Sequence, residues 1–251
     1  MEDITIKRSF EGYGSESFIS DFIPCRYGAA CNFFFGEDMH QKQLDVLHAL
    51  RSVEKLDIHD SVVLGQYFHY QKENQVKDDS MTETYAALRL FVDNERWKDV
   101  PFYIRTGKKL NRREMEIVIT FKRTNPDVDA NVLLIRIQPT EGVYFQFNIK
   151  KPGDSDEIVT TSMDFCQSCS DFNRINTPEA YERLLQAAVQ QDTSWFSKWD
   201  QIEYSWSYVE QLKERMKQEQ LPLFTYMADS DGPTEADELL MRHHHKWNSI
   251  S

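Results

Sequence analysis

An alternation of apolar and polar residues between positions 115 and 150 is the feature that most constrains the fold. Apolar side chains recur at every second position in 115–121, 132–138 and 143–149. Because successive side chains of a strand point to opposite faces of its sheet, this period predicts three half-buried antiparallel strands. The sequence Pro-Thr-Glu-Gly at 139–142 predicts a hairpin between the last two. The chain should therefore contain a large, mainly antiparallel sheet.

Two helical patterns follow in the C-terminal third. Thr177 is a suitable N-cap for a helix with Pro178 at its first position. Apolar residues then recur at helical spacing in 181–189 and in 202–212, which predicts two helices that cover the sheet. The stripes consist of Tyr181, Leu184, Leu185, Ala188 and Val189, and of Ile202, Trp206, Val209 and Leu212.

These patterns predict a single α+β domain over residues 1–251, with helices packed on one face of the sheet. The 251 residues, 40% of them hydrophobic and 13% aromatic, suffice for one packed core. Residues 18–36 show no helical period, and the polar tail after residue 242 is expected to be poorly ordered. No apolar run approaches the roughly 18 residues that cross a bilayer, and no signal peptide opens the chain. We therefore expect a cytoplasmic protein without a membrane partner.

The densest positive cluster lies in 97–113 of a chain whose formal net charge is −12. An apolar strand at 102–104 precedes Gly107, whose conformational freedom would let the chain turn. A solvated surface loop is the alternative interpretation. The acidic balance elsewhere predicts that nucleic acid is not a partner. Four cations would fan out beyond the turn and meet an anion: Lys108, Lys109, Arg112 and Arg113.

The four cysteines leave two interpretations open. Cys166 and Cys169 have the spacing of zinc ligands, and Cys25 and Cys31 would complete a tetrahedral set. Free thiols in a reducing cytosol are the preferred interpretation, because no histidine stands at ligand spacing near either pair. The three histidines at 243–245 suit adventitious metal binding or a polar tail, and we expect the tail.

Five stretches resemble the C-terminal domain of glucose-6-phosphate dehydrogenase. They are 62–67 (VVLGQY), 93–97 (DNERW), 97–110 (WKDVPFYIRTGKKL), 135–139 (IRIQP) and 232–239 (GPTEADEL). They follow the family's order from about residue 40 to the end of the chain. The resemblance implies the family's α+β domain and the pentose phosphate pathway, in which glucose 6-phosphate becomes 6-phosphogluconolactone with NADP as oxidant.

The resemblance also implies ligand contacts. Lys108 and Arg113 match basic positions that contact the sugar phosphate, and Gln138 matches a polar contact on a neighbouring strand. Arg8 stands where the family has a glutamate that accepts hydrogen bonds from sugar hydroxyls. Any sugar phosphate should therefore bind weakly.

A second set of matching positions concerns the structural NADP of some members. Arg105, Arg136 and Tyr144 match residues that hold it. The family's lysine two positions after this tyrosine is Gln146 here. That replacement argues against a structural NADP, so no cofactor is expected for this chain alone.

No catalytic residue is predicted. The family pairs an aspartate with a histidine base five residues later, whereas Asp21 is followed at that spacing by Arg26. His40 is the remaining nearby histidine, and we expect it on the surface of a helix. The chain has nine glycines and no G-x-G-x-x-G fingerprint, so nothing in it predicts a coenzyme fold.

Three functional interpretations follow. The first is a non-catalytic protein that forms a homodimer, or a hetero-oligomer with a full-length glucose-6-phosphate dehydrogenase, and keeps part of the sugar-phosphate surface. The second is an enzyme half that needs a separate Rossmann chain. The third is a truncated or misread gene of an authentic enzyme, in which residues 18–36 are the misread stretch.

Overall fold

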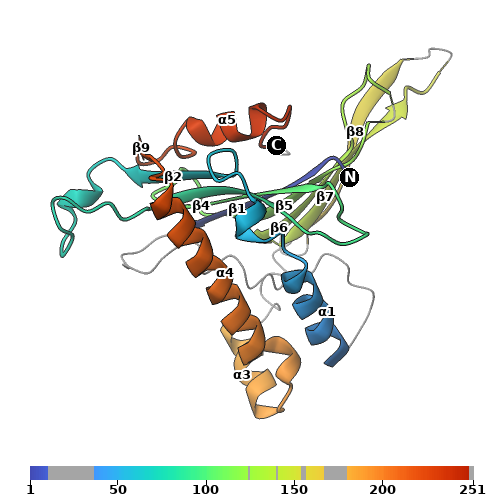
Figure 1. Ribbon diagram of the computed structural model, residues 1–251. Coiled ribbons are helices and arrows are strands. Elements are labelled where there is room, and N and C mark those ends of the chain that lie inside the picture. Colours follow the sequence, from blue (N-terminus) through green and yellow to red (C-terminus); the bar gives the residue numbers. More distant parts are fainter. Residues whose placement is uncertain (11–36, 124, 140, 154–156, 167–179, 249–251) are drawn as a thin grey trace.

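A nine-stranded mixed sheet forms the centre of the described part of this computed structural model (Figure 1). The strands are β1 (Asp3–Phe10), β2 (Val62–Tyr67), β3 (Tyr85–Phe91), β4 (Pro101–Lys108), β5 (Met115–Thr120), β6 (Val132–Gln138), β7 (Gly142–Lys150), β8 (Ile158–Cys166) and β9 (Leu223–Tyr226). Their order is β8-β7-β6-β5-β1-β4-β3-β2-β9. β1 runs parallel to β4 and β2 runs parallel to β9, whereas the other neighbours are antiparallel.

The structure describes residues 1–10, 37–123, 125–139, 141–153, 157–166 and 180–248. The three strands predicted from alternation are β5, β6 and β7, and β6 and β7 form the predicted hairpin, in which Leu134 pairs with Tyr144. The α+β class and the mainly antiparallel sheet are confirmed. None of the helices in the described ranges is long and apolar enough to cross a membrane.

Helices cover the sheet unequally. The described α-helices are α1 (Glu37–His48), α3 (Ala180–Val189), α4 (Trp199–Gln218) and α5 (Glu235–Met241), and short 3-10 turns lie at η2 (Val53–Lys55), η3 (Tyr70–Lys72) and η4 (Thr193–Trp195). Figure 1 shows α1, α3 and α4 on one side of the sheet and α5 on the other. The predicted packing on one face is thus correct for α1 and α4, whereas α5 lies on the other face.

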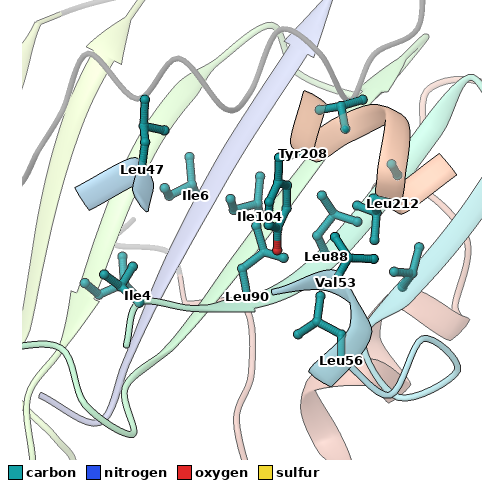
Figure 2. Close-up of a cluster of buried hydrophobic side chains, with 14 of the residues drawn as sticks. Ile4, Ile6, Leu47, Val53, Leu56, Leu88, Leu90, Ile104, Tyr208 and Leu212 are labelled. Carbon is teal, nitrogen blue, oxygen red and sulfur yellow. The ribbon is translucent and has the colours of Figure 1, made fainter. Parts of the chain in front are cut away.

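The larger core lies between α1, α4 and the near face of the sheet (Figure 2). Alternate residues of three adjacent strands, Ile6 on β1, Ile104 on β4 and Leu88 on β3, point to this face. Tyr208 and Leu212 of α4 lie against them. Burial of such side chains contributes about 1.5 to 3 kcal/mol each, so this contact fixes α4 on the sheet.

A second core explains why α5 lies on the far face. The residues that alternate with the first set include Tyr85 and Tyr103, and both are fully buried. Leu239 and Leu240 of α5 cover them together with Tyr226. Because β3 and β4 are apolar on both faces, one layer of helices leaves half of their surface uncovered, and α5 supplies the second layer.

The apolar stripe predicted for 181–189 does not cover the sheet, and that expectation is wrong. Leu185 is 69% exposed and Val189 is 85% exposed, whereas Ala187 is buried. Figure 1 shows the reason, since α3 lies beside the beginning of α4, away from the strands. The second stripe is half correct, because Val209 and Leu212 are buried whereas Trp206 is 47% exposed. Thr177 and Pro178 lie outside the described residues.

The segment after α5 makes contacts where the sequence suggested little order. The hydroxyl of Tyr103 lies 2.9 Å from Nδ1 of His245, and Nδ2 of Asn248 donates to Oγ1 of Thr120 at 3.0 Å. The indole of Trp247 donates to the carbonyl of Ala236 at 3.4 Å. Polar composition predicted a solvated tail, but β4 and β5 offer buried partners for those polar groups.

Gly232 should be required by the packing of Tyr85. A Cβ at Gly232 would lie 2.4 Å from Cε2 of Tyr85, and Gly232 has a φ of +108°. Gly232→Ala combines overpacking of a buried ring with a left-handed φ, so we expect it to lower the free energy of unfolding by about 2 to 4 kcal/mol. Urea denaturation measures this loss.

Gly153→Ala is the matched control. Gly153 has a comparable φ of +120°, but nothing lies within 4 Å of its Cβ position. It should lose only the conformational contribution, about 1 kcal/mol. Equal losses at the two glycines would show that contact with Tyr85 is not what requires Gly232.

Candidate functional site

The basic cluster begins inside a strand, which corrects the predicted turn at Gly107. Gly107 lies within β4 and pairs with Tyr85 of β3. Glycine at this position allows the ring of Tyr85 to pack closely against the backbone, because a Cβ there would lie 2.7 Å from Cδ2 of Tyr85. The left-handed φ, +53°, falls instead on Lys109. Sequence could not separate these roles, since glycine suits a turn and a tight contact equally well.

Lys108 consequently does not fan out with the other cations. Its side chain is buried at the end of β4, and burial lowers its pKa. Its carbonyl accepts a hydrogen bond from the hydroxyl of Tyr226 at 2.7 Å. Arg112 and Arg113 follow on an exposed segment before β5. The predicted cluster is thus divided between one buried and several exposed cations.

The structure does not bring Gln138 to Lys108. Lys108 ends β4, whereas Gln138 ends β6 just after a register shift, where it pairs with Met115 of β5. The two strands are also separated by β1 and β5, hence by three strand spacings or about 14 Å. The side chain of Arg8, whose backbone pairs with Thr106, lies outside the described residues.

The far face carries a row of charged side chains across four neighbouring strands. Lys7 of β1 is the register partner of Arg105 on β4 and of Glu116 on β5, and Glu116 faces Arg136 on β6. Lys7, Arg105 and Glu116 are buried. Burial, and then the neighbouring Arg105, lower the pKa of Lys7. We call these four residues the charge row.

Each end of the charge row is closed by an aromatic ring. Nε of Arg136 donates to Oε1 of Glu116 at 2.8 Å, and its guanidinium lies 5.0 Å from the ring centre of Tyr144. The guanidinium of Arg105 lies 4.6 Å from the ring centre of Trp247. Cation–π contacts of this kind contribute about 0.5 to 2 kcal/mol each.

The three residues predicted for a structural NADP therefore share one face, but they do not fit a dinucleotide as folded. Arg136 and Tyr144 contact each other, and Arg105 contacts Trp247. The pocket beside Arg105, also lined by Asp231, measures about 10 Å³, roughly one water molecule. Sequence reasoning missed Lys7 and Trp247 as members of this face. The alternation of 3–10 could have placed Lys7, whereas the position of Trp247 depends on the tail.

His40 is less exposed than the surface position predicted for it. It lies on α1, and its side chain is 15% exposed. Its Nε2 lies 3.0 Å from Oδ2 of Asp200 at the beginning of α4. Gln201 donates to Gln43 at 2.9 Å beside it. These pairs join α1 to α4, which is a structural role.

The cysteine predictions are tested only at Cys166. It is disulfide-bonded at the end of β8, to a cysteine outside the described residues, so the expectation of a free thiol is wrong there. Cys25, Cys31 and Cys169 lie outside the described residues, as do Asp21 and Arg26. Among the described side chains, no group of three histidine, cysteine or acidic residues is arranged to hold a metal ion.

Sequence analysis also missed a surface pocket of about 380 Å³ at the opposite end of β5 and β7. Its lining includes the cations Lys122, Arg123 and Lys150 and the amides of Asn131 and Asn148. Nδ2 of Asn148 donates to the carbonyl of Asp129 at 2.6 Å, so the amide is occupied by the chain itself. The basic residues are far apart in sequence, and only the hairpin brings them together.

Comparison with known proteins gives a consistent result. Residues 31–248 match the family model described as "Glucose-6-phosphate dehydrogenase, C-terminal domain". Glucose-6-phosphate 1-dehydrogenase of Bacillus subtilis is 36% identical over 231 residues, which are 84% of this chain and 47% of the relative. The Borreliella burgdorferi protein of the same name is 38% identical over 234 residues, 86% of this chain and 48% of the relative.

The fold agrees with that match. A solved glucose-6-phosphate dehydrogenase in complex with its substrate glucose-6-phosphate superposes with a TM-score of 0.83 at 28% identity, covering 99% of this chain and 56% of that one. This chain thus spans about half the length of the relatives that it matches. It belongs to the glucose-6-phosphate dehydrogenase family, of which it carries the C-terminal domain.

Proposed function

We propose that these 251 residues act as the non-catalytic sheet domain of a glucose-6-phosphate dehydrogenase, in the cytoplasm and in the pentose phosphate pathway. The observation that carries the proposal is the replacement of the family's histidine base: Asp21 is followed five residues later by Arg26. The chain has no G-x-G-x-x-G fingerprint and no Asp–His pair at the family spacing. The described residues offer a packed sheet, a basic strand end and an apolar edge that they leave exposed.

The purified chain alone should not oxidise glucose 6-phosphate with NADP. Loss of a general base costs about 100- to 10,000-fold in rate, and a dinucleotide that is not held against the sugar cannot accept its hydride. NADPH absorbance measures turnover, with the Bacillus subtilis relative as positive control. The chain is expressed in a host strain that lacks its own glucose-6-phosphate dehydrogenase, so that the host enzyme cannot contaminate the assay. Turnover that falls on His40→Ala would contradict the proposal.

Binding of glucose 6-phosphate should be weak, with a dissociation constant in the millimolar range or higher. Arg8 stands where the family has an accepting glutamate, and about 14 Å separates the strands of Lys108 and Gln138, so a sugar phosphate should lose charge-assisted contacts that are worth about 1.5 to 3 kcal/mol each. Calorimetry should show that Lys108→Ala abolishes the remaining heat. The control Lys98→Ala removes an exposed cation elsewhere and should leave it unchanged. A micromolar constant, or indifference to Lys108→Ala, would refute this account.

The chain should also associate through the edge of its sheet. Beyond the helices, β7 and β8 expose apolar side chains on one face, which we call the edge patch: Val143, Ile149, Met163 and Phe165. Met163 and Phe165 are 60% and 66% exposed. Phe145 and Phe147 stack beside them with ring centres 5.2 Å apart. Apolar surface of this kind is typical of an interface, and we propose a homodimer or a hetero-oligomer with a full-length enzyme.

Met163→Lys should dissociate this assembly. Burying an unpaired ammonium in an apolar interface of standard size, about 1,600 Å² in total, costs several kcal/mol, so the dimer constant should weaken at least about 100-fold. Light scattering at micromolar concentration measures it. Ser162→Lys adds the same charge to the opposite face of β8 and should leave the dimer intact. A wild-type chain that is monomeric at this concentration would exclude the edge patch as an interface.

One observation favours the alternative of a misread gene. β1, residues 3–10, lies in the middle of the sheet between β4 and β5, yet the family match begins only at residue 31. A central strand of the fold thus lies in a segment that the family match leaves out. Sequencing the genomic DNA around codons 18–36 and upstream of Met1 tests this alternative. A Gly-rich fingerprint and an Asp–His pair in another frame would establish it, and an enzyme half would instead need a separately encoded Rossmann chain.

A further inference from the structure

The segment after α5 crosses back over the far face of the sheet and covers the charge row at Arg105. Trp247 lies on the guanidinium of Arg105 and against the ring of Tyr103, with ring centres 6.4 Å apart. Its indole N–H donates to the carbonyl of Ala236 on α5. Asn248 reaches Thr120 on β5. Residues 243–248, which we call the strap, thus span from α5 to β5.

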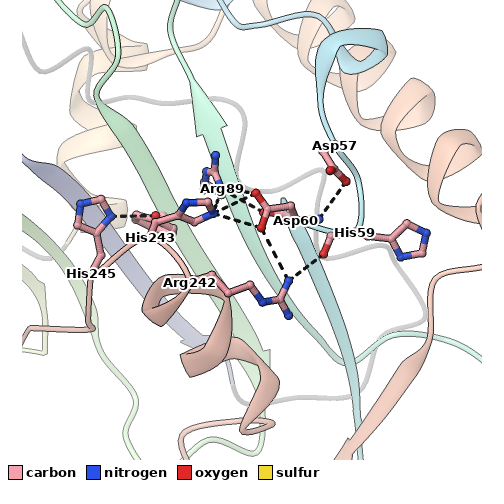
Figure 3. A network of polar contacts seen from close by, with 8 residues as sticks. Asp57, His59, Asp60, Arg89, Arg242, His243 and His245 are labelled. Atoms are coloured by element: carbon pink, nitrogen blue, oxygen red, sulfur yellow. Dashed lines mark hydrogen bonds and ion pairs between the residues drawn. The ribbon is translucent and has the colours of Figure 1, made fainter.

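Two histidines fasten the strap, and Figure 3 shows both. Nε2 of His243 lies 3.0 Å from Oδ2 of Asp60 and also contacts the guanidinium of Arg89. Nδ1 of His245 lies 2.9 Å from the hydroxyl of Tyr103. His244, between them, is exposed. The strap is therefore held by alternate histidines that point into the molecule.

The charges around His243 disfavour its protonated form. Asp60 alone faces it with negative charge, whereas Arg89 on β3, Arg242 at the end of α5, and His245 face it with positive or titratable groups. Arg89 is already paired with Asp60 at 2.6 Å. An imidazolium at this position would place a further cation against one shared carboxylate.

His245 lies against Asp3 of β1 and Tyr103 of β4. Oδ2 of Asp3 lies 3.9 Å from its Nε2, and Glu2, Arg89 and His244 also act on it. Burial raises the pKa of Asp3 to about 6, so this carboxylate becomes neutral over the same range in which a histidine becomes charged. An imidazolium of His245 would then lose the closest carboxylate that faces it.

We propose that the neutral imidazoles of His243 and His245 fasten residues 243–248 over Arg105, and that the strap is released when both imidazoles are protonated. Release uncovers the guanidinium of Arg105 and opens the far face of the charge row. The device goes beyond the proposed function, because it depends neither on catalysis nor on assembly of the chain.

The direction of the pH dependence follows from burial. Burial lowers the pKa of both histidines from the ordinary 6.5, so fastening is complete above about pH 6.5 and weakens as pH falls below it. Asp3 acts in the opposite direction, since its raised pKa makes burial easier below about pH 6. The histidines themselves make the strap's contacts with Asp60 and with the hydroxyl of Tyr103, so acid should release the strap.

Quenching of Trp247 by acrylamide tests the proposal. Fluorescence quenching is measured from about pH 8 to about pH 5.5 for the unmodified chain and for Trp247→Phe. The difference between the two gives the signal of Trp247. Circular dichroism shows whether the sheet stays folded over this range. Trp247 should be protected at the higher pH and accessible at the lower. The equilibrium constant that favours the fastened strap over the released strap should fall in acid. The fall should be about tenfold for each unit by which fastening lowers the pKa of a histidine.

Substitution of the histidines separates the strap from general acid effects. The double variant of His243→Gln and His245→Gln has no imidazole to protonate at these two positions, so its Trp247 should not become more accessible as pH falls. His244→Gln is the matched control, because His244 is exposed, and it should keep the full pH dependence. The proposal is overturned if Trp247 of the unmodified chain is equally accessible at both pH values. It is also overturned if Trp247 of the double variant still becomes more accessible as pH falls.

Discussion

Pairing of charges inside the sheet is the constraint on which the rest of this structure depends. Helices and the strap cover the central strands on both faces, so Lys7 and Glu116 are largely removed from bulk water. An unpaired buried charge costs several kcal/mol, and the register that sets Lys7 opposite Glu116 offsets this cost. A one-residue slip of β1 would move Lys7 into the apolar core and Ile6 onto the charge row. The charge row therefore fixes the register of the central strands as firmly as the apolar contacts do.

Much of the fold was predictable because its signals are local. Alternation located β5, β6 and β7, and helical spacing located α3 and α4. The misplacements came from contacts between distant segments. α3 packs at the beginning of α4 rather than on the sheet, and Gly107 meets Tyr85 rather than turning the chain. Periodicity reports which face of an element is apolar, but it does not report what covers that face.

The candidate site was predictable only as a set of residues. Resemblance supplied Lys108, Gln138 and Arg105, but their positions relative to one another depend on strand order and on alternation. Arg105 and Lys108 are three residues apart on one strand, so they point to opposite faces. This separation divides the basic strand end into two regions: Lys108 next to the larger core, and Arg105 within the charge row beneath Trp247. Ligands at these two regions would contact different sides of the sheet.

The width of the sheet explains why an apolar edge remains. Nine strands in the described residues span eight spacings, or about 38 Å, whereas two packed helices about 10 Å in diameter cover about 20 Å. α1 and α4 lie over the strands from β5 to β2, and α3 extends from α4 rather than along the sheet. β7 and β8 thus lie beyond the reach of the helices in the described residues. A chain with a net charge of −12 repels its copies at long range, so the apolar contact at the edge patch would have to overcome that repulsion. Salt should therefore strengthen association through the edge patch, because screening weakens the repulsion while apolar burial persists.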